Sequence, residues 1–130
     1  MKKTMFLAAM LMLVAVACRK PADEPAAPEE PFCDTVCLYH PGDYGSAKWR
    51  IPAIICLDDG TLLAINDRRK NNFRDLPEDI DIVVRRSNDD GRTWSEPETI
   101  IAGTGYKHGY GDPAVVQCQN GDVLCLFAGG

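Results

Sequence analysis

The sequence predicts an all-β fold built as an antiparallel meander of short strands. Apolar runs of strand length recur from residue 36 onward, and none continues with the 3.6-residue period of an amphipathic helix. Three hairpin dipeptides separate these runs: Asp59-Gly60, Asp90-Gly91 and Asn120-Gly121. Each dipeptide supplies the positive φ angles that tight hairpin turns require. The third observation is a turn that closes on a tryptophan, Trp94.

The apolar runs define seven expected strands: 36–40, 51–57, 61–68, 80–87, 97–101, 113–118 and 122–128. Seven strands are compatible with a small sandwich or barrel, or with one four-stranded propeller blade and part of a second. The hairpin spacing and the Trp94 turn favour the propeller. Asp81 interrupts the most strand-like run, and because an unpaired carboxylate is costly in a core we expect it to face a polar channel or an edge.

Composition is that of one small globular domain. The chain has 130 residues, of which 45% are hydrophobic and 25% charged, and its net charge is −5. An acidic chain without a stripe of Lys and Arg is a poor match for nucleic acid, so no nucleic-acid partner is expected.

The N-terminus has the layout of an export signal. Lys2 and Lys3 precede an apolar run that is too short to span a membrane. The run ends in Ala-Val-Ala before Cys18, which resembles the lipobox of bacterial lipoproteins, so residues 1–17 are predicted to be a signal peptide and Cys18 to be lipidated. The alternative is an ordinary secreted protein cleaved nearby.

Residues 18–35 are dominated by Pro and Glu and are expected to be a solvated tether. The prediction is therefore an exported lipoprotein held to a membrane by its lipid anchor, facing the periplasm or the cell surface, with the outer membrane favoured. Five cysteines remain after Cys18, an odd number that leaves at least one thiol unpaired.

None of the cysteine positions predicts a metal site or a disulfide framework. Cys33 and Cys37 form at most a weak metal pair, because no His or Cys partner follows at zinc spacing. Cys56, Cys118 and Cys125 lie in apolar runs and are expected to be small hydrophobic residues of the core.

Residues 87–94 fit the Asp-box pattern Ser-x-Asp-x-Gly-x-Thr-Trp. Asp89 can accept backbone N–H groups across the turn, Gly91 permits a left-handed step, and Trp94 can pack beneath both. The pattern occurs in sialidases and in other β-propellers, so it predicts a propeller blade more strongly than an activity. No catalytic role is assigned to it.

The tripeptide Arg50-Ile51-Pro52 precedes an apolar strand, which places the arginine at the strand mouth. A guanidinium binds a carboxylate through two parallel hydrogen bonds and keeps its charge at any physiological pH. Without the Asp box, a surface ion pair would be the better interpretation. With it, residues 47–130 resemble the start of the catalytic domain of bacterial sialidases. The resemblance implies that residues 36–130 form about the first one and a half blades of a six-bladed β-propeller.

The resemblance also implies an activity: retaining exo-α-sialidase hydrolysis of terminal sialic acid from glycans or glycoproteins. Arg50 would be the first of three arginines that clamp the sugar carboxylate. Arg69, with Arg68 as the alternative, would be a further arginine near the substrate. Asp75 would be the acid/base catalyst, and Asp112 would contact polar substituents of the sugar.

A partly desolvated loop over residues 69–79 is expected to raise the pKa of Asp75 enough for it to act as an acid. Asp67 and Asp79 are lower-ranked candidates for the same role. No metal or cofactor is expected, because fixed arginines would already neutralise the sugar carboxylate.

The family's tyrosine nucleophile, its glutamate partner and two clamp arginines have no counterpart in these 130 residues. The chain alone is therefore expected to be inactive, and residues 18–130 expressed alone are expected to aggregate or fold poorly. The alternative function is that of a truncated or non-catalytic propeller lipoprotein that binds glycans.

Overall fold

The structure is a computed structural model that describes residues 34–130. The predicted signal peptide, the lipidation site Cys18, Cys33 and nearly all of the tether lie outside these residues. Within residues 34–130, no helix has both the length and the apolar character needed to span a bilayer.

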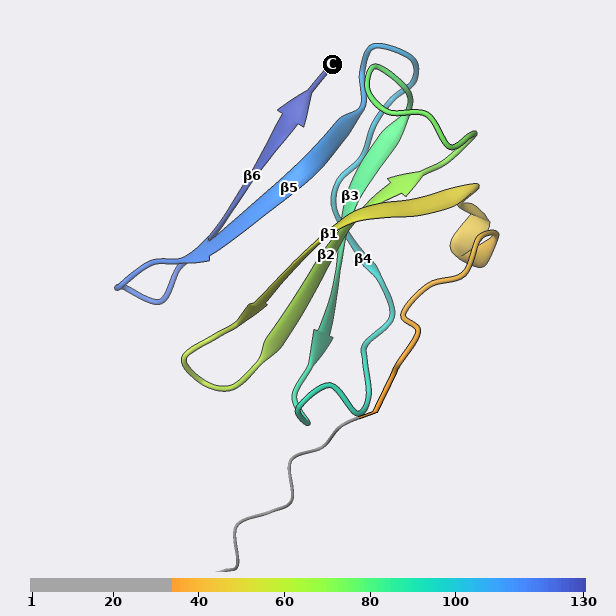
Figure 1. The fold of residues 1–130 in the computed structure, drawn as a ribbon. Helices are drawn as coiled ribbons and strands as arrows, with labels where there is room; N and C mark the ends of the chain where they lie inside the picture. Colours follow the sequence, from red (N-terminus) through yellow and green to blue (C-terminus); the bar gives the residue numbers. More distant parts are fainter. Residues whose placement is uncertain (1–33) are drawn as a thin grey trace, which may run out of the picture. The chain divides into compact units, whose positions relative to one another are not determined.

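The described residues form two antiparallel sheets (Figure 1), which confirms the predicted all-β antiparallel class. A short 3-10 turn, η1 (Asp43–Gly45), precedes the first sheet. In that sheet the strands follow the chain order: β1 (Lys48–Cys56), β2 (Leu62–Arg69), β3 (Ile80–Ser87) and β4 (Glu98–Ile101). The second sheet pairs β5 (Tyr110–Gln117) with β6 (Val123–Gly129).

The predicted strand 36–40 is wrong, because this segment is irregular. Side chains hold it in place of a strand ladder: the ring of Tyr39 stacks on Trp49 with centroids 3.9 Å apart. The carbonyl of Leu38 also accepts a hydrogen bond from Arg85 Nη1 at 2.6 Å. A short apolar run can therefore be aromatic packing rather than a strand.

Two strands begin earlier than predicted. β1 starts at Lys48, because residues 48–50 pair with residues 67–69 of β2. β5 starts at Tyr110, which pairs with Gly129 of β6. In both strands the pairing continues past a proline by means of a bulge, which a search for unbroken apolar runs does not detect.

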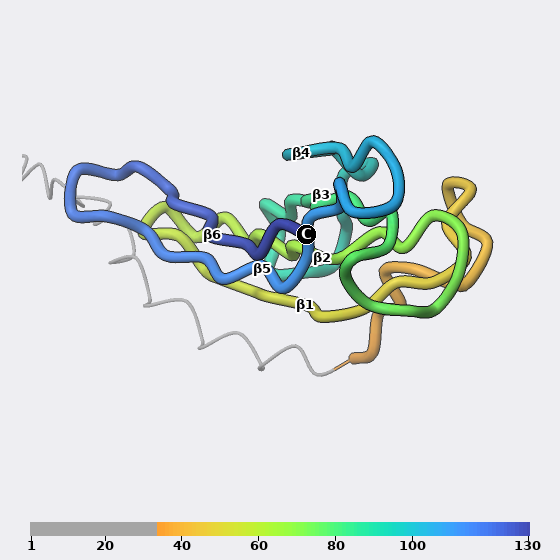
Figure 2. The backbone as a smooth tube through the Cα atoms, turned by 90° about the horizontal axis from the view of Figure 1, so that it is seen from above, coloured from red at the N-terminus to blue at the C-terminus, as the bar shows by residue number. Residues whose placement is uncertain are grey.

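The core lies on one face of β2 and β3, the two central strands. Its centre is made of Leu63, Ile65, Ile82 and Val84, all buried. Apolar residues of β1 and β5 pack against it, and β5 contacts β1, β2 and β3 (Figure 2). Full burial of each such side chain stabilises the fold by about 1.5–3 kcal/mol.

The two hairpins β1–β2 and β5–β6 share the same irregularities. Ile51 and Asp112 both have positive φ angles, 52° and 58°, and each precedes a proline within a bulge. Their tight turns also match, with Gly60 at φ 86° and Gly121 at φ 89°. The second sheet thus repeats the first half of the first sheet, as a second propeller blade would. The total number of blades stays a prediction.

Asp81 is fully buried, so the expectation that it faces a polar channel or an edge is wrong. Its carboxylate accepts hydrogen bonds from Arg68 Nε at 2.9 Å and from the backbone N–H of Gly103 at 2.7 Å. Lys70 Nζ lies 3.1 Å away. Protein partners rather than water therefore offset the cost of burying this charge.

The Ser87–Trp94 turn has the predicted internal bonds. Asp89 Oδ1 accepts the backbone N–H of Thr93 at 2.8 Å, and Oδ2 accepts the Thr93 hydroxyl at 2.6 Å. The indole N–H of Trp94 donates to the carbonyl of Gly91 at 2.9 Å. These bonds account for the residue types of the pattern without any catalytic role.

Replacing Asp89 with alanine is expected to lower the thermal unfolding temperature of the protein at neutral pH. The hydroxyl and N–H of Thr93 and the hydroxyl of Ser87 lower the pKa of Asp89 from 3.8 to about 2. A lowered folded-state pKa stabilises the fold above pH 3.8, and this stabilisation is lost as the pH falls through 2. The difference in Tm between wild type and Asp89→Ala should therefore shrink below pH 4 and vanish near pH 2.

Asp90→Asn is the control for this series, because the Asp90 side chain is 78% exposed in the same turn and asparagine tolerates its positive φ of 58°. It should change Tm little at any pH. A pH-independent difference for Asp89→Ala would contradict the bonding pattern at the turn.

The four described cysteines are free thiols. Cys118 and Cys125 are half-buried, whereas Cys56 is exposed. Side chains of β1 alternate strictly between exposed and half-buried, and Cys56 is one of the exposed ones. The prediction that Cys56 lies in the core is therefore wrong.

Candidate functional site

The candidate site lies where β2 ends. Alternate residues of a strand share one face, and on β2 this face carries Leu63 and Ile65 in the core, then Asp67 and Arg69. Arg50 of β1 is the register partner of Asp67. The face of the sheet thus changes from apolar to charged at the end where the chain enters the loop 70–79 (Figure 1).

Arg69 is the centre of the site and is only 1% exposed. Its Nη1 donates to the carbonyl of Phe73 at 2.7 Å, which anchors the loop. Its Nη2 lies 3.0 Å from Asp75 Oδ2 and 3.6 Å from Asp67 Oδ2, as ion pairs without hydrogen-bond geometry. Nε therefore remains a buried donor without a hydrogen-bond acceptor, a state that favours binding of an anion, whereas Nη2 already lies beside a carboxylate.

Three carboxylates surround this guanidinium. Asp67, Asp75 and Asp112 place oxygen atoms within 4.8 Å of one another, and within residues 34–130 they are the group with a geometry that could hold a metal ion. Arg69 lies against two of them, so its positive charge partly neutralises the cluster.

Asp75 is an ionised carboxylate in the free protein, which corrects the expected upward pKa shift. Partial burial raises its pKa, but the N–H of Leu76 and the guanidiniums of Arg69 and Arg50 together outweigh burial and lower the pKa. The influence of Arg50 also shows that this exposed arginine reaches the same site as Asp75.

Asp67 has the opposite shift. Burial raises its pKa to about 6, against the lowering effects of the Asp112 N–H and of Arg69. The repulsion from Asp112 and Asp75 adds to the increase. The site thus holds two neighbouring acids whose pKa values are shifted in opposite directions, as acid/base sites often do.

Sequence comparison shows that the chain is similar to part of several sialidases. It is 36% identical over 87 residues to a sialidase from Bacteroides fragilis and 38% identical over 86 residues to one from Micromonospora viridifaciens. Among solved structures, Hadza microbial sialidase Hz136 matches 68% of the chain with a TM-score of 0.64 and 35% identity. The chain is similar, in sequence and in fold, to a part of bacterial sialidases.

The chain spans a small share of the length of these relatives. The two aligned regions cover 62% and 64% of the chain, but only 16% and 13% of the B. fragilis and M. viridifaciens proteins. The match to Hz136 covers 19% of that structure. A search against protein-family models finds no match.

The structure gathers the four residues that the sequence singled out: Arg50, Arg69, Asp75 and Asp112. They come from β1, β2, the loop 70–79 and β5. Asp112 joins them because its backbone N–H donates to Asp67 Oδ1 at 3.1 Å. The roles of these side chains stay predictions.

Two of the alternative site residues, Arg68 and Asp79, lie outside this cluster. Arg68 points to the opposite face of β2 from Arg69 and pairs with the buried Asp81. Asp79 is bound by Lys70 Nζ at 2.6 Å and takes no part in the carboxylate cluster.

Asp67 is the residue that sequence reasoning ranked too low. It lies fully buried in the middle of the site rather than beside it. Its position two residues before Arg69 on one strand was a usable signal, because that spacing places both side chains on the same face.

The loop between β4 and β5 contacts the loop 70–79, which carries Asp75. The backbone N–H of Lys107 donates to the carbonyl of Pro77 at 2.6 Å. Gly109 packs so closely on the same loop that a Cβ there would lie 2.0 Å from the carbonyl oxygen of Glu78. Both loops are found at the same end of the molecule in Figure 1.

Gly109→Ala is expected to displace the loop 70–79 and to destabilise the protein by at least about 1–3 kcal/mol, the usual cost of overpacking. Urea unfolding measures the loss. Gly129→Ala is the control, because Gly129 has no positive φ and a Cβ there would lie 3.6 Å from the Tyr110 ring, an ordinary contact distance. Equal losses for the two variants would show that the close approach of Gly109 does not matter.

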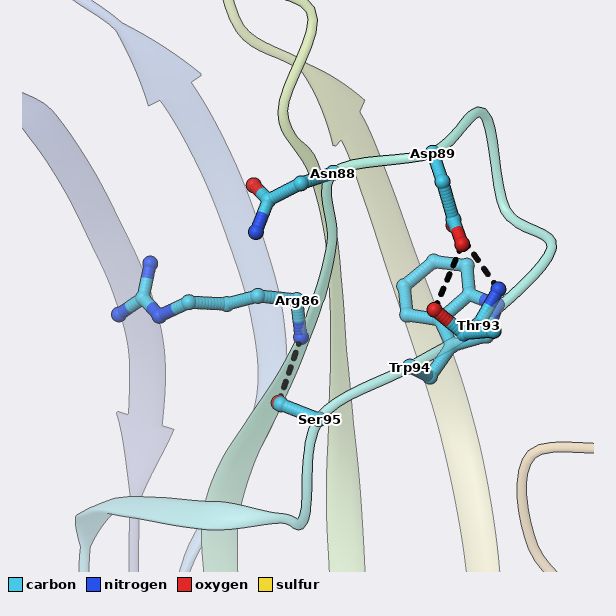
Figure 3. Close-up of a pocket in the computed structure, with 6 residues that line it drawn as sticks. All are labelled: Arg86, Asn88, Asp89, Thr93, Trp94 and Ser95. Carbon is cyan, nitrogen blue, oxygen red and sulfur yellow. Dashed lines mark hydrogen bonds between the residues drawn. The ribbon is translucent and has the colours of Figure 1, made fainter.

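A hollow of about 410 Å³ lies at the other end of β3, beside the Ser87–Trp94 turn (Figure 3). Its polar groups are mostly used within the turn: Asp89 binds Thr93, and Ser95 Oγ accepts the backbone N–H of Arg86 at 3.0 Å. The polar groups around this hollow therefore stabilise the turn, and the hollow is not interpreted as a second functional site.

Proposed function

We propose that the protein containing this chain is a retaining exo-α-sialidase that releases terminal sialic acid from glycans and glycoproteins. The observation that carries the proposal is the convergence of two arginines and two aspartates at one end of the first sheet. The similarity to named sialidases supports it.

Arg50 and Arg69 are proposed to bind the carboxylate of the sugar. Arg69 is rigid, because it is buried and anchored on Phe73, and its Nε has no hydrogen-bond acceptor. Arg50 is exposed and approaches from the neighbouring strand. A carboxylate between the two guanidiniums would receive charge-assisted hydrogen bonds from a preorganised pair.

Asp75 is proposed to give a proton to the departing glycosidic oxygen and then to take one from water. In the free protein its pKa is lowered by Arg69 and Arg50. A bound sugar carboxylate competes for the same guanidiniums and adds a negative charge nearby, and both effects raise the pKa of Asp75. Substrate binding therefore favours the protonated acid that the first step needs.

This coupling predicts a difference between two pH profiles. The parameter kcat/KM reports the pKa values of the free enzyme, and kcat reports those of the substrate complex. The loss of activity caused by ionisation of Asp75 should therefore occur at higher pH in kcat than in kcat/KM. Coincident profiles would mean that the substrate does not change the environment of Asp75.

The direct test incubates the protein with a sialylated oligosaccharide and follows the product by NMR. Retention predicts that the α anomer of free sialic acid appears first. Release of the β anomer first would contradict the retaining mechanism, and binding of the glycan without release would favour a non-catalytic glycan-binding protein. The retaining step needs a nucleophile; by family resemblance it is a tyrosine with a glutamate partner outside residues 34–130.

We further propose that the protein is a lipoprotein anchored through Cys18. The support is the sequence pattern before Cys18 and the Pro- and Glu-rich residues that follow it. Cys18→Ser should move the protein from the membrane fraction to the soluble fraction of the cell. An unchanged distribution would remove the lipid anchor from the proposal.

A further inference from the structure

Asp67 is a buried acid for which the proposed mechanism has no use. It is fully buried, and one of its oxygens, Oδ1, accepts the backbone N–H of Asp112 at 3.1 Å. The other, Oδ2, lies 3.6 Å from Arg69 Nη2 and has no hydrogen-bond partner. Asp67 therefore contacts both the arginine and the strand that carries Asp112.

We propose that Asp67 is a positioning residue of this site, which orients Asp112 through its backbone and Arg69 through its charge. The inference deepens the proposed sialidase function and rests on it for its catalytic consequence. The geometric part, in which Asp67 couples the two sheets, stands on the contacts alone.

The coupling to Asp112 works through the bulge of β5. Asp112 has a φ of 58°, a left-handed conformation that is uncommon for a residue with a side chain. The hydrogen bond to Asp67 stabilises this conformation, because it holds the Asp112 N–H at a fixed direction. Gly111 permits the approach, since a Cβ at this position would lie 3.2 Å from Asp67 Oδ2.

The coupling to Arg69 works through charge. Arg69 Nη2 lies beside both Asp67 and Asp75, so an ionised Asp67 shares the charge of the fixed guanidinium with Asp75, and a protonated Asp67 leaves that charge to Asp75 alone. The charged groups that face Asp67 are Arg69 on β2, Asp75 on the loop and Asp112 on β5. Because burial raises the pKa of Asp67 to about 6, its charge changes close to neutral pH.

The first test is an NMR titration of the protein containing this chain, in which the Asp112 amide resonance is followed with pH. In the wild type this resonance should shift with a midpoint near pH 6, the value of Asp67. Asp67→Asn keeps an oxygen acceptor and removes the charge, so the shift near pH 6 should disappear. Asp81→Asn is the matched control, because it alters another fully buried aspartate and should leave the Asp112 titration unchanged.

Gly111→Ala provides a second variant with no change of charge. Its added Cβ should push against Asp67 Oδ2 and alter the Asp112 amide resonance while the rest of the spectrum stays folded. Persistence of the pH 6 shift in Asp67→Asn would overturn the proposal. This measurement needs no turnover, so it remains valid even if the protein cleaves no sialoside.

The second test is kinetic. Asp67→Asn should lower kcat/KM for a sialylated oligosaccharide by at least about tenfold, mainly through KM, because misplaced binding groups weaken substrate positioning. Asp81→Asn should reduce stability with KM unchanged. Wild-type KM in Asp67→Asn would overturn the positioning role, whereas a wild type that shows the amide titration but no turnover would overturn the proposed function alone.

Discussion

Replacing Asp75 with alanine is expected to reduce the cleavage of natural sialosides by about 100- to 10,000-fold, the usual contribution of general acid catalysis. A natural leaving group is a sugar hydroxyl, whose oxygen needs a proton as the glycosidic bond breaks. An aryl sialoside with an acidic phenol needs no such proton. The same variant should therefore cleave the aryl substrate far better than the natural one, and kcat for both substrates measures the difference.

Glu78→Gln is the matched control, because Glu78 lies in the same loop and its carboxylate makes only a long contact of 3.9 Å with Arg74. It should retain activity on both substrates. Equal losses of Asp75→Ala on natural and aryl substrates would remove Asp75 from the acid role and leave it a structural partner of Arg69.

The largest effect on stability is expected at Asp81. Asp81→Ala should lower the free energy of unfolding by about 3–5 kcal/mol, because it leaves the charges of Arg68 and Lys70 beside an empty buried position. It also removes the acceptor for the Gly103 N–H, which attaches the loop after β4 to β3. Denaturant unfolding of wild type and variant at pH 7 measures the loss.

A surface ion pair gives the comparison. Glu98 lies 3.7 Å from Arg86, and both side chains are exposed, so Glu98→Ala should cost less than about 1 kcal/mol. A cost at Asp81 no greater than that at Glu98 would show that the buried network around Asp81 contributes little.

Sequence patterns predicted the strands best where local chemistry decides the structure. Gly60, Gly91 and Gly121 all adopt the positive φ angles expected of their turns. The four site residues taken from the Arg50 motif and its resemblance also come together at one end of the sheet. These features depend on residues close in the chain, or on motifs that imply a known arrangement.

The remaining features depend on contacts between segments far apart in the chain. Asp81 is buried because Arg68, Lys70 and Gly103 reach it from other elements. Asp75 has a lowered pKa because two arginines from neighbouring strands add to the effect of the Leu76 N–H. No local pattern contains this information, so both were predicted incorrectly.

The central claim is that Arg50 binds the carboxylate of the sugar at the site of Asp75. The most direct measurement determines kcat/KM for the wild type and for Arg50→Ala. Each protein is assayed with an aryl sialoside and with the neutral methyl ester of its carboxylate. Lys48→Ala, another exposed cation of β1, is the control. Arg50→Ala should lower kcat/KM about 100-fold for the acid, as expected when one partner of a charge pair is removed, with little change for the ester. An equal loss on the acid and the ester would contradict the claim.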